Sequence, residues 1–152
     1  GLGDVYKRQL EVSTTLPAVL NRQLSRDSQL SVQDFEVLVR LCEADGAQMR
    51  VVALAEHMGW ERSRLSHHLT RMKKRGLVER RVCCCDGRGA VIHLTDQGAA
   101  ALQQAAPGHV ALVRRVFFGG LDCGHLNDLE AILSRIRQSL AAESKVNPTD
   151  PE

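Results

Sequence analysis

Apolar side chains recur at helical spacing along most of the chain, which predicts a mostly helical protein. The clearest helix begins at Ser31, because a serine followed three residues later by Asp34 is close to a capping box. Asp45-Gly46 ends it, since glycine readily adopts the left-handed conformation after a helix. The apolar face of this helix consists of Phe35, Val37, Leu38, Leu41 and Cys42.

The segment before that helix has a weaker pattern. Residues 1–9 match no helix or strand pattern, and we interpret them as a non-native leader. Apolar positions within residues 10–29 fit one face of a helix, in which Pro17 is tolerable only in the first turn. The sequence therefore predicts a weakly specified N-terminal helix region.

Two short helices joined by a tight turn follow. Residues 51–58 predict a helix that Gly59 ends, and residues 62–75 predict a second one. In the second helix Leu65, Leu69 and Met72 fall within a stripe of about 60° and form its buried face. Such a pair is a helix-turn-helix candidate. The opposite side of the second helix carries Ser63, His67, Thr70 and Lys74, flanked by Arg64 and Arg71.

A β-hairpin is predicted directly after this helix. Residues 77–82 and 90–94 are rich in β-forming side chains, and Asp86-Gly87-Arg88-Gly89 is a good turn between them. A hairpin in this position is a wing. Arg88 near its tip would reach an adjacent minor groove, where narrow A·T tracts attract arginine.

Two further helices are predicted in the C-terminal third. Thr95-Asp96 caps a helix that extends to about residue 118, and Pro107-Gly108 should kink or split it. Asp122 can cap a last helix with apolar residues at spacings of three and four, and the tail 143–152 is expected to be disordered. Together these helices offer more apolar surface than a small winged domain can cover, which favours pairing with a second copy.

Positive charge is concentrated on the second helix and the hairpin. Residues 61–88 contain nine Lys or Arg and three acids, a net charge of +6, whereas the whole chain carries +2. The remainder therefore sums to −4. Charge gathered in this way is typical of a surface that meets a phosphate backbone.

Composition excludes several other classes. Aromatic residues make up 3% of the 152 residues, so the core must be built from aliphatic side chains. No apolar run approaches the roughly 20 residues that span a bilayer, and the N-terminus lacks the apolar region of a signal peptide. The five cysteines, three of them contiguous, favour a reducing cytoplasm. No nucleophile–base pair, phosphate loop or cofactor motif points to an enzyme.

The order of these elements resembles MarR-type bacterial transcriptional regulators. The resemblance covers about residues 30–140, and its most telling parts are the end of the basic helix (residues 65–78), the wing's Asp-x-Arg, and the Leu-Thr-x-x-Gly of residues 94–98. It implies a homodimer with interlocking terminal helices that binds a pseudo-palindromic DNA operator, usually represses, and responds to a small aromatic effector. It also assigns Arg62 to Lys74 as the recognition helix.

The predicted fold is therefore mostly α (α+β), a winged helix-turn-helix with N- and C-terminal dimerisation helices. Residues 10–29 form the N-terminal dimerisation region, 30–95 the DNA-binding domain and 96–142 the C-terminal dimerisation helices. No catalytic or metal-binding residue and no cofactor is assigned. The predicted DNA-binding residues are Arg62, Ser63, Arg64, Ser66, His67, His68, Arg71, Lys74, Arg75 and Arg88.

Two features leave alternatives open. Cys83, Cys84 and Cys85 at the base of the wing suggest a redox or soft-metal sensor. Against this, neighbouring residues on a strand point to opposite faces, so the three thiols are also compatible with ordinary packing. His67 and His68 suggest a pH-dependent contribution to DNA binding. A winged helix that binds an acidic protein partner is the remaining alternative.

Overall fold

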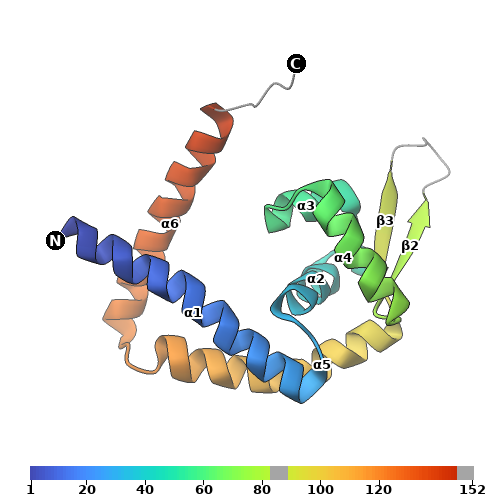
Figure 1. The fold of residues 1–152 in the computed structure, drawn as a ribbon, viewed down its shortest axis with the longest axis horizontal. Helices are drawn as coiled ribbons and strands as arrows, with labels where there is room; N and C mark the ends of the chain where they lie inside the picture. Colours follow the sequence, from blue (N-terminus) through green and yellow to red (C-terminus); the bar gives the residue numbers. More distant parts are fainter. Residues whose placement is uncertain (83–88, 147–152) are drawn as a thin grey trace. The chain divides into compact units, whose positions relative to one another are not determined.

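The protein is described by a computed structural model that covers residues 1–82 and 89–146 (Figure 1). The predicted mostly helical fold with a small antiparallel sheet is confirmed. The helices are α1 (Leu2–Ser28), α2 (Val32–Glu43), α3 (Val51–Met58), α4 (Arg62–Lys74), α5 (Asp96–Val113) and α6 (Cys123–Val146). The strands are β1 (Gln48–Arg50), β2 (Val78–Val82) and β3 (Ala90–Leu94). Shorter turns are the 3-10 segment η1 (Asp45–Ala47) and the π segment η2 (Arg114–Phe118).

The chain divides into two compact units, residues 1–111 and residues 112–152. The first unit contains the hydrophobic core, which α2, α3, α4, β2 and β3 build mainly from aliphatic side chains. Among its fully buried members are Leu38, Leu41, Leu54, Leu65 and Ile92, each at 0% exposure. This core fixes α4 on one side, so that its other side faces solvent.

The capping box at the start of α2 forms as the sequence predicts. The Asp34 amide donates to Ser31 Oγ, and the Ser31 amide donates to Asp34 Oδ2, each over 3.0 Å. These bonds satisfy two of the amides that a helix leaves free at its N-terminus. Because Asp34 is also buried, its carboxylate is available to partners from other elements.

The helix-turn-helix pair forms as predicted, with α3 at the predicted bounds and α4 ending one residue earlier than predicted. Gly59 ends α3 with a φ of 64°, a left-handed conformation that glycine adopts without strain. Its amide bonds back to the end of α3, and the Trp60 amide donates to the Ala55 carbonyl over 3.0 Å. The chain therefore turns within three residues into α4.

A three-stranded antiparallel sheet follows α4, with the order β1-β3-β2. In the hairpin Val78 pairs with Leu94 and Val82 with Ala90, as the two predicted strands require. The third strand, β1, was not predicted; it pairs Met49 with Ile92. Three residues are too few to show an alternating pattern, and β1 depends on a partner more than 40 residues later in the sequence.

Both prolines that were expected to limit helices lie inside them. α1 runs without a break from Leu2 through Pro17, so the expectation that this helix starts near Leu10 is wrong. α5 likewise continues through Pro107 and is not split. Each proline removes one hydrogen bond to a carbonyl four residues earlier, at Ser13 and Gln103. Both residues are exposed, so water can satisfy the freed carbonyls.

The second unit consists of the end of α5, η2 and α6. Asp122 caps α6 as predicted, since its Oδ1 accepts from the His125 amide over 2.8 Å. The predicted apolar stripe of α6 is mostly exposed, with Leu126, Ile132, Leu133, Ile136 and Leu140 between 37% and 62% accessible. Among the described residues, no helix is long and apolar enough to cross a membrane.

Candidate nucleic-acid interface

Helix α4 has one buried side and one exposed side. Leu65, Leu69 and Met72 are at most 2% exposed and anchor the helix in the core. The side chains of Ser63, His67, Thr70 and Lys74 are exposed on the opposite side, where the helical periodicity predicts them. Polar side chains on a helix that is held this firmly can be presented to a partner without reordering the backbone.

The N-terminal part of α4 carries two exposed arginines, Arg62 and Arg64. The Arg64 guanidinium carbon lies 4.0 Å from the centre of the Trp60 ring, a cation–π contact. Trp60 in turn packs edge-on against His68, with ring centres 5.5 Å apart. Through these contacts Trp60 packs the turn between α3 and α4 against α4.

His68 lies inside the domain, which corrects the expectation that it faces DNA. Its exposure is 8%, and its Nε2 lies 2.9 Å from Asp34 Oδ1. Its Nδ1 lies 3.2 Å from Nη2 of Arg71. His68 is thus enclosed by side chains from α2 and α4, whereas its neighbour His67 is exposed.

Asp34 is a buried carboxylate at 3% exposure with partners from two helices. Besides His68 and its own capping box, it accepts a 2.7 Å hydrogen bond from Arg75 Nη1. Burial alone would raise the pKa of Asp34. The hydrogen bonds from His68, the Ser31 amide and Arg75 outweigh that effect and hold this pKa well below its usual range.

Arg75 joins the end of α4 to the start of α2. Its Nη1 pairs with Asp34, and its Nη2 donates to the carbonyl of Gln29 over 2.6 Å. Its side chain nevertheless remains 41% exposed. Arg75 therefore has a structural role that the sequence did not reveal, and only its remaining N–H groups are available to a phosphate.

The other flank of α4 borders the hairpin. Ser66 is half-buried, and its Oγ accepts a 3.1 Å hydrogen bond from Arg80 Nη1 of β2. The next residue, Arg81, pairs with Glu79 over 2.8 Å on the same strand. Arg80 and Arg81 were not among the predicted site residues, although both belong to the charge cluster of residues 61–88. Their exposure extends the basic surface from α4 to the sheet.

A hollow of about 420 Å³ lies between the start of α2 and one flank of α4. Three arginines, one histidine and one buried carboxylate surround it, so positive charge predominates. Its lining residues are Ser31, Gln33, Asp34, Trp60, Arg64, His68, Arg71 and Arg75.

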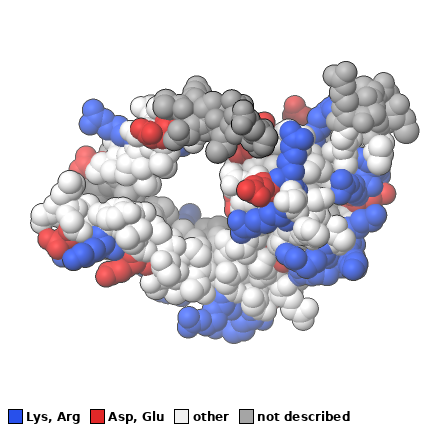
Figure 2. All heavy atoms as spheres, turned by 45° about the horizontal axis from the view of Figure 1, so that its top comes forward, with Lys and Arg blue, Asp and Glu red and all other residues white. Residues whose placement is uncertain are grey.

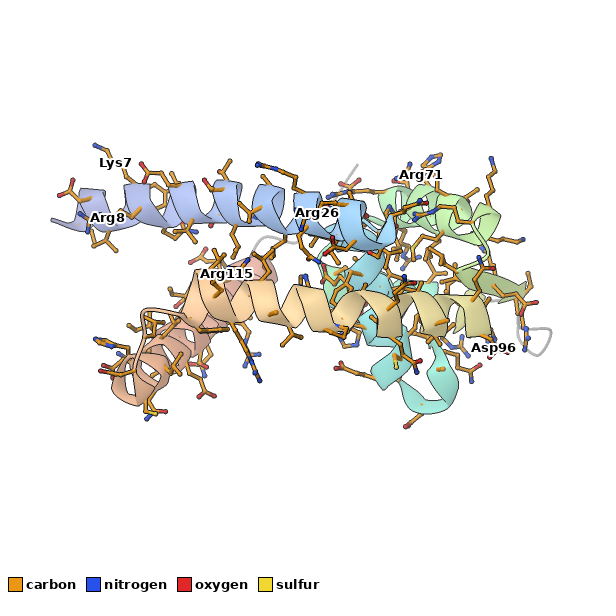
Figure 3. All side chains as sticks on the ribbon, turned by 90° about the horizontal axis from the view of Figure 1, so that it is seen from below. Lys7, Arg8, Arg26, Arg71, Asp96 and Arg115 are labelled. Atoms are coloured by element: carbon orange, nitrogen blue, oxygen red, sulfur yellow. The ribbon has the colours of Figure 1, made fainter. Side chains whose placement is uncertain are left out.

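Figure 2 shows Lys and Arg side chains crowded on the part of the first unit that holds α4 and the strands. Figure 3 places Arg71 on α4 and Asp96 at the start of α5. Acidic partners neutralise part of this charge, as in the pairs of Arg75 and Arg81. No ion pair is found for Arg62, Arg64 or Lys74 among the described residues. The surface therefore keeps a positive excess.

Several predicted residues lie outside the described part of the chain. These are Arg88, the turn residue Asp86, and the three candidate sensor thiols Cys83, Cys84 and Cys85. Cys42, which the sequence places on the apolar face of α2, is an exposed free thiol, and so is Cys123. Within residues 1–82 and 89–146, no three His, Cys, Asp or Glu side chains form a group that could hold a metal ion.

A helix-turn-helix followed by a hairpin, with a basic and exposed second helix, defines the winged-helix class of DNA-binding domain. A model described as the MarR family matches residues 28–89. The chain belongs to the MarR family of transcriptional regulators, because it is also 36% identical to AbsC, a MarR family transcriptional regulator from Streptomyces coelicolor. That similarity covers 92% of this chain and 94% of that chain, with a TM-score of 0.87.

Two further solved structures contain DNA. Sco3205, a MarR family regulator from Streptomyces coelicolor in complex with DNA, is 36% identical over 90% of this chain and 85% of that chain, with a TM-score of 0.86. A mutant of E. coli MarR complexed with operator DNA shares the fold at 24% identity, over 88% and 93% of the two chains, with a TM-score of 0.77. A search of curated proteins found no match.

Proposed function

We propose that this chain binds a pseudo-palindromic DNA operator as a homodimer and represses transcription until a small aromatic effector binds. The observation that carries the DNA-binding part is the exposed basic side of α4, which the core holds rigidly from behind. The DNA-bound structure of a relative that is 36% identical supports it.

The proposed contacts follow from the two sides of α4. With 13 residues the helix is about 20 Å long, which suits a major groove. Ser63 and His67 on the outer face would meet base edges, with Arg64 and Arg71 reaching bases or nearby phosphates. Arg62, Lys74 and the free donors of Arg75 would hold phosphates, Ser66 and Arg80 would support the flank, and Arg88 would enter the minor groove.

The exposed apolar surface supports a homodimer. In the second unit, Phe117, Leu126, Leu129 and Leu133 line a hollow of about 410 Å³ on the exposed side of α6. In the first unit, Leu10 and Val12 of α1, within the predicted dimerisation region 10–29, are 46% and 51% exposed. Apolar surface of this extent usually marks an interface. A dimer formed through both terminal regions would also present two DNA-binding domains, one for each half-site of a palindrome.

Buried polar atoms on α1 and α5 support an effector. Gln23 Oε1 and His109 Nδ1 are buried and have no hydrogen-bond partner within the described residues. The His109 ring packs 4.3 Å from the ring of Phe35, and burial lowers the pKa of His109. An aromatic ligand with a phenol or carboxyl group would match an aromatic wall beside unpaired polar atoms.

Selection of bound duplexes from a random DNA pool, with purified protein at physiological salt, tests the proposal. We expect an inverted repeat whose half-sites lie about one helical turn, roughly 10 base pairs, apart. Affinity for the selected duplex should fall steeply with salt. DNA binding without any sequence preference would refute the proposed operator. Binding to an acidic protein instead of DNA would favour the alternative of a winged-helix protein-interaction module.

Single alanine variants locate the interface. We expect Arg71→Ala, Lys74→Ala and Arg88→Ala to weaken binding to the selected duplex with little change in thermal stability. Lys74→Ala should also reduce the magnitude of the slope of log affinity against log salt by about 1, the value expected for loss of one phosphate contact. Lys7→Ala, which removes an exposed cation from α1, is the matched control. Unchanged affinity in both Arg71→Ala and Arg88→Ala at fixed salt would refute the assignment.

A further inference from the structure

The contact between Arg71 and His68 restricts how the imidazole can be protonated while the contact lasts. Arg71 Nη2 lies 3.2 Å from His68 Nδ1. A guanidinium has N–H donors and no acceptor, so Nδ1 must accept with its lone pair. The proton of the neutral ring is therefore on Nε2, which lies 2.9 Å from Asp34 Oδ1. The Arg71 contact is therefore compatible with the neutral ring that carries its proton on Nε2, and Asp34 of α2 and Arg71 of α4 flank the ring on its two nitrogens.

A second proton would have to bind at Nδ1, the atom that accepts from Arg71. An imidazolium ring is a donor at both nitrogens and carries the same sign of charge as a guanidinium. Protonation would therefore replace the hydrogen bond with repulsion over a few ångströms. Arg71 is exposed, so its guanidinium can move into solvent. Asp34 would stay paired with Nε2 and stabilise the charge on the buried ring.

The charged groups around His68 come from α2 and α4. Asp34 is the carboxylate, and it is shared with Arg75. Arg71 touches the ring directly, and Arg64 lies beyond Trp60, which packs against the ring edge. All of these groups line the hollow of about 420 Å³ between α2 and α4, which gives the ring a route for proton exchange.

We propose that His68 is a positioning residue that holds Arg71 against α4 when neutral and releases it toward DNA phosphates when protonated. This inference rests on the proposed DNA-binding function. A released guanidinium regains all of its hydrogen-bond donors, and a protonated ring adds positive charge. Both changes favour binding to the polyanionic DNA. DNA affinity should therefore rise as pH falls through the range of about 5 to 8 in which histidines titrate.

The first test measures the affinity for the selected duplex between about pH 8 and about pH 5.5 at fixed salt. We expect the wild-type affinity to rise by about three- to tenfold more than that of His68→Gln, the equivalent of one hydrogen bond. Glutamine keeps an N–H for Asp34 but does not titrate. His57→Gln, which removes an exposed histidine of α3, should keep the wild-type profile. Identical profiles for His68→Gln and the wild type would overturn the proposal.

Arg71→Ala separates release of the arginine from simple addition of charge. If the proton acted only through its own charge, Arg71→Ala would keep the full pH dependence. Release of Arg71 predicts that the part lost in His68→Gln is largely lost in Arg71→Ala as well, and that the double variant is no flatter than either. A full pH dependence in Arg71→Ala contradicts the proposed mechanism. Circular dichroism at each pH verifies that all variants remain folded.

An NMR titration of the full chain without DNA provides an independent readout. We expect the Arg71 guanidinium and the His68 ring to change with the same midpoint, and the Arg71 response to vanish in His68→Gln. An Arg71 signal that does not follow His68 would overturn the inference. Failure of the wild type to select any duplex would instead refute the proposed function, and the NMR result would still decide whether His68 controls Arg71.

Discussion

Asp34 shows how a single side chain serves both local and long-range structure. It completes the capping box of α2 with Ser31, and it also anchors α4 through His68 and Arg75. A buried carboxylate is costly unless hydrogen bonds replace water. Here the three partners supply those bonds, so the orientation of α4 relative to α2 depends on the charge of one residue.

Asp34→Asn should lower the free energy of unfolding by about 2–4 kcal/mol, because His68 and Arg75 lose a charged partner. The pKa of Asp34 is depressed in the folded protein. Its stabilisation is therefore complete above the unfolded pKa of about 3.9 and is lost as pH falls further. Urea unfolding from neutral to acid pH should show the wild type and the variant converging below about pH 4.

Asp27→Asn on α1 is the matched control for this experiment. The pKa of Asp27 is also lowered, by hydrogen bonds from Gln23 and Arg26, but the side chain is exposed. Its replacement should change stability much less than Asp34→Asn. Equal losses of unfolding free energy in the two variants would show that the burial of the Asp34 network adds nothing to stability.

At the scale of elements, the base of the wing is a tight joint between the end of α4, β2 and the start of α5. Thr95 Oγ1 donates to the Gly76 carbonyl over 2.6 Å and accepts from the Gly98 amide over 2.9 Å. A Cβ at Gly98 would collide with the carbonyl oxygen of Leu77. The Leu-Thr-x-x-Gly pattern of residues 94–98 is thus explained by a hydroxyl cap and a close backbone approach.

Gly98→Ala should destabilise the protein by about 2–3 kcal/mol, because a backbone carbonyl cannot move aside as a side chain can. This outcome opposes helix propensity, which favours alanine over glycine inside a helix by about 1 kcal/mol. Thermal unfolding provides the measurement. Gly120→Ala, where a Cβ meets nothing within 4 Å, should change stability little. A neutral or stabilising Gly98→Ala would contradict the close packing of this joint.

Elements with strong local signals were predictable from the sequence. The helix at residues 51–58 and the strand at 90–94 have the predicted bounds because a Gly stop and a run of β-forming residues mark them. The strand at 48–50 and the helix at residues 2–9 have no comparable local signal. The strand forms because it pairs with β3. The helix at residues 2–9 is a continuation, toward the N-terminus, of the helix predicted from residue 10.

The outer face of α4 was predictable, whereas the arrangement of its flank was not. His68 lies only about 40° around the helix from Met72, so periodicity alone places it at the margin of the buried stripe. The partner that decides its burial, Asp34, comes from another helix. The same applies to Arg75, whose anchoring partners lie more than 40 residues away. Side-chain networks between elements cannot be derived from the period of one helix.

At the scale of the whole molecule, charge and apolar surface are separated along the sequence. Residues 61–88 carry the positive excess, and the rest of the chain sums to −4. The largest exposed apolar side chains lie instead toward the two ends, on α1 and α6. In the proposed homodimer, this separation would let one part of the chain bind a polyanion while other parts bind the second copy.

The proposed dimer predicts that charge on the apolar face of α6 will dissociate it. Leu133 and Ile136 are about half exposed in the single chain, at 50% and 48%. Burying the exposed half of two such side chains contributes about 1.5–3 kcal/mol, and burying an unpaired lysine adds a further cost. Leu133→Lys combined with Ile136→Lys should therefore raise the dimer dissociation constant by at least about 100-fold. Sedimentation equilibrium measures this constant.

DNA affinity should fall in parallel, because a monomer meets only one half-site. Gln138→Lys, which adds one positive charge on the other side of α6, should leave the dimer intact. A wild type that is monomeric at micromolar concentration, or a double variant that remains dimeric, would refute this interface.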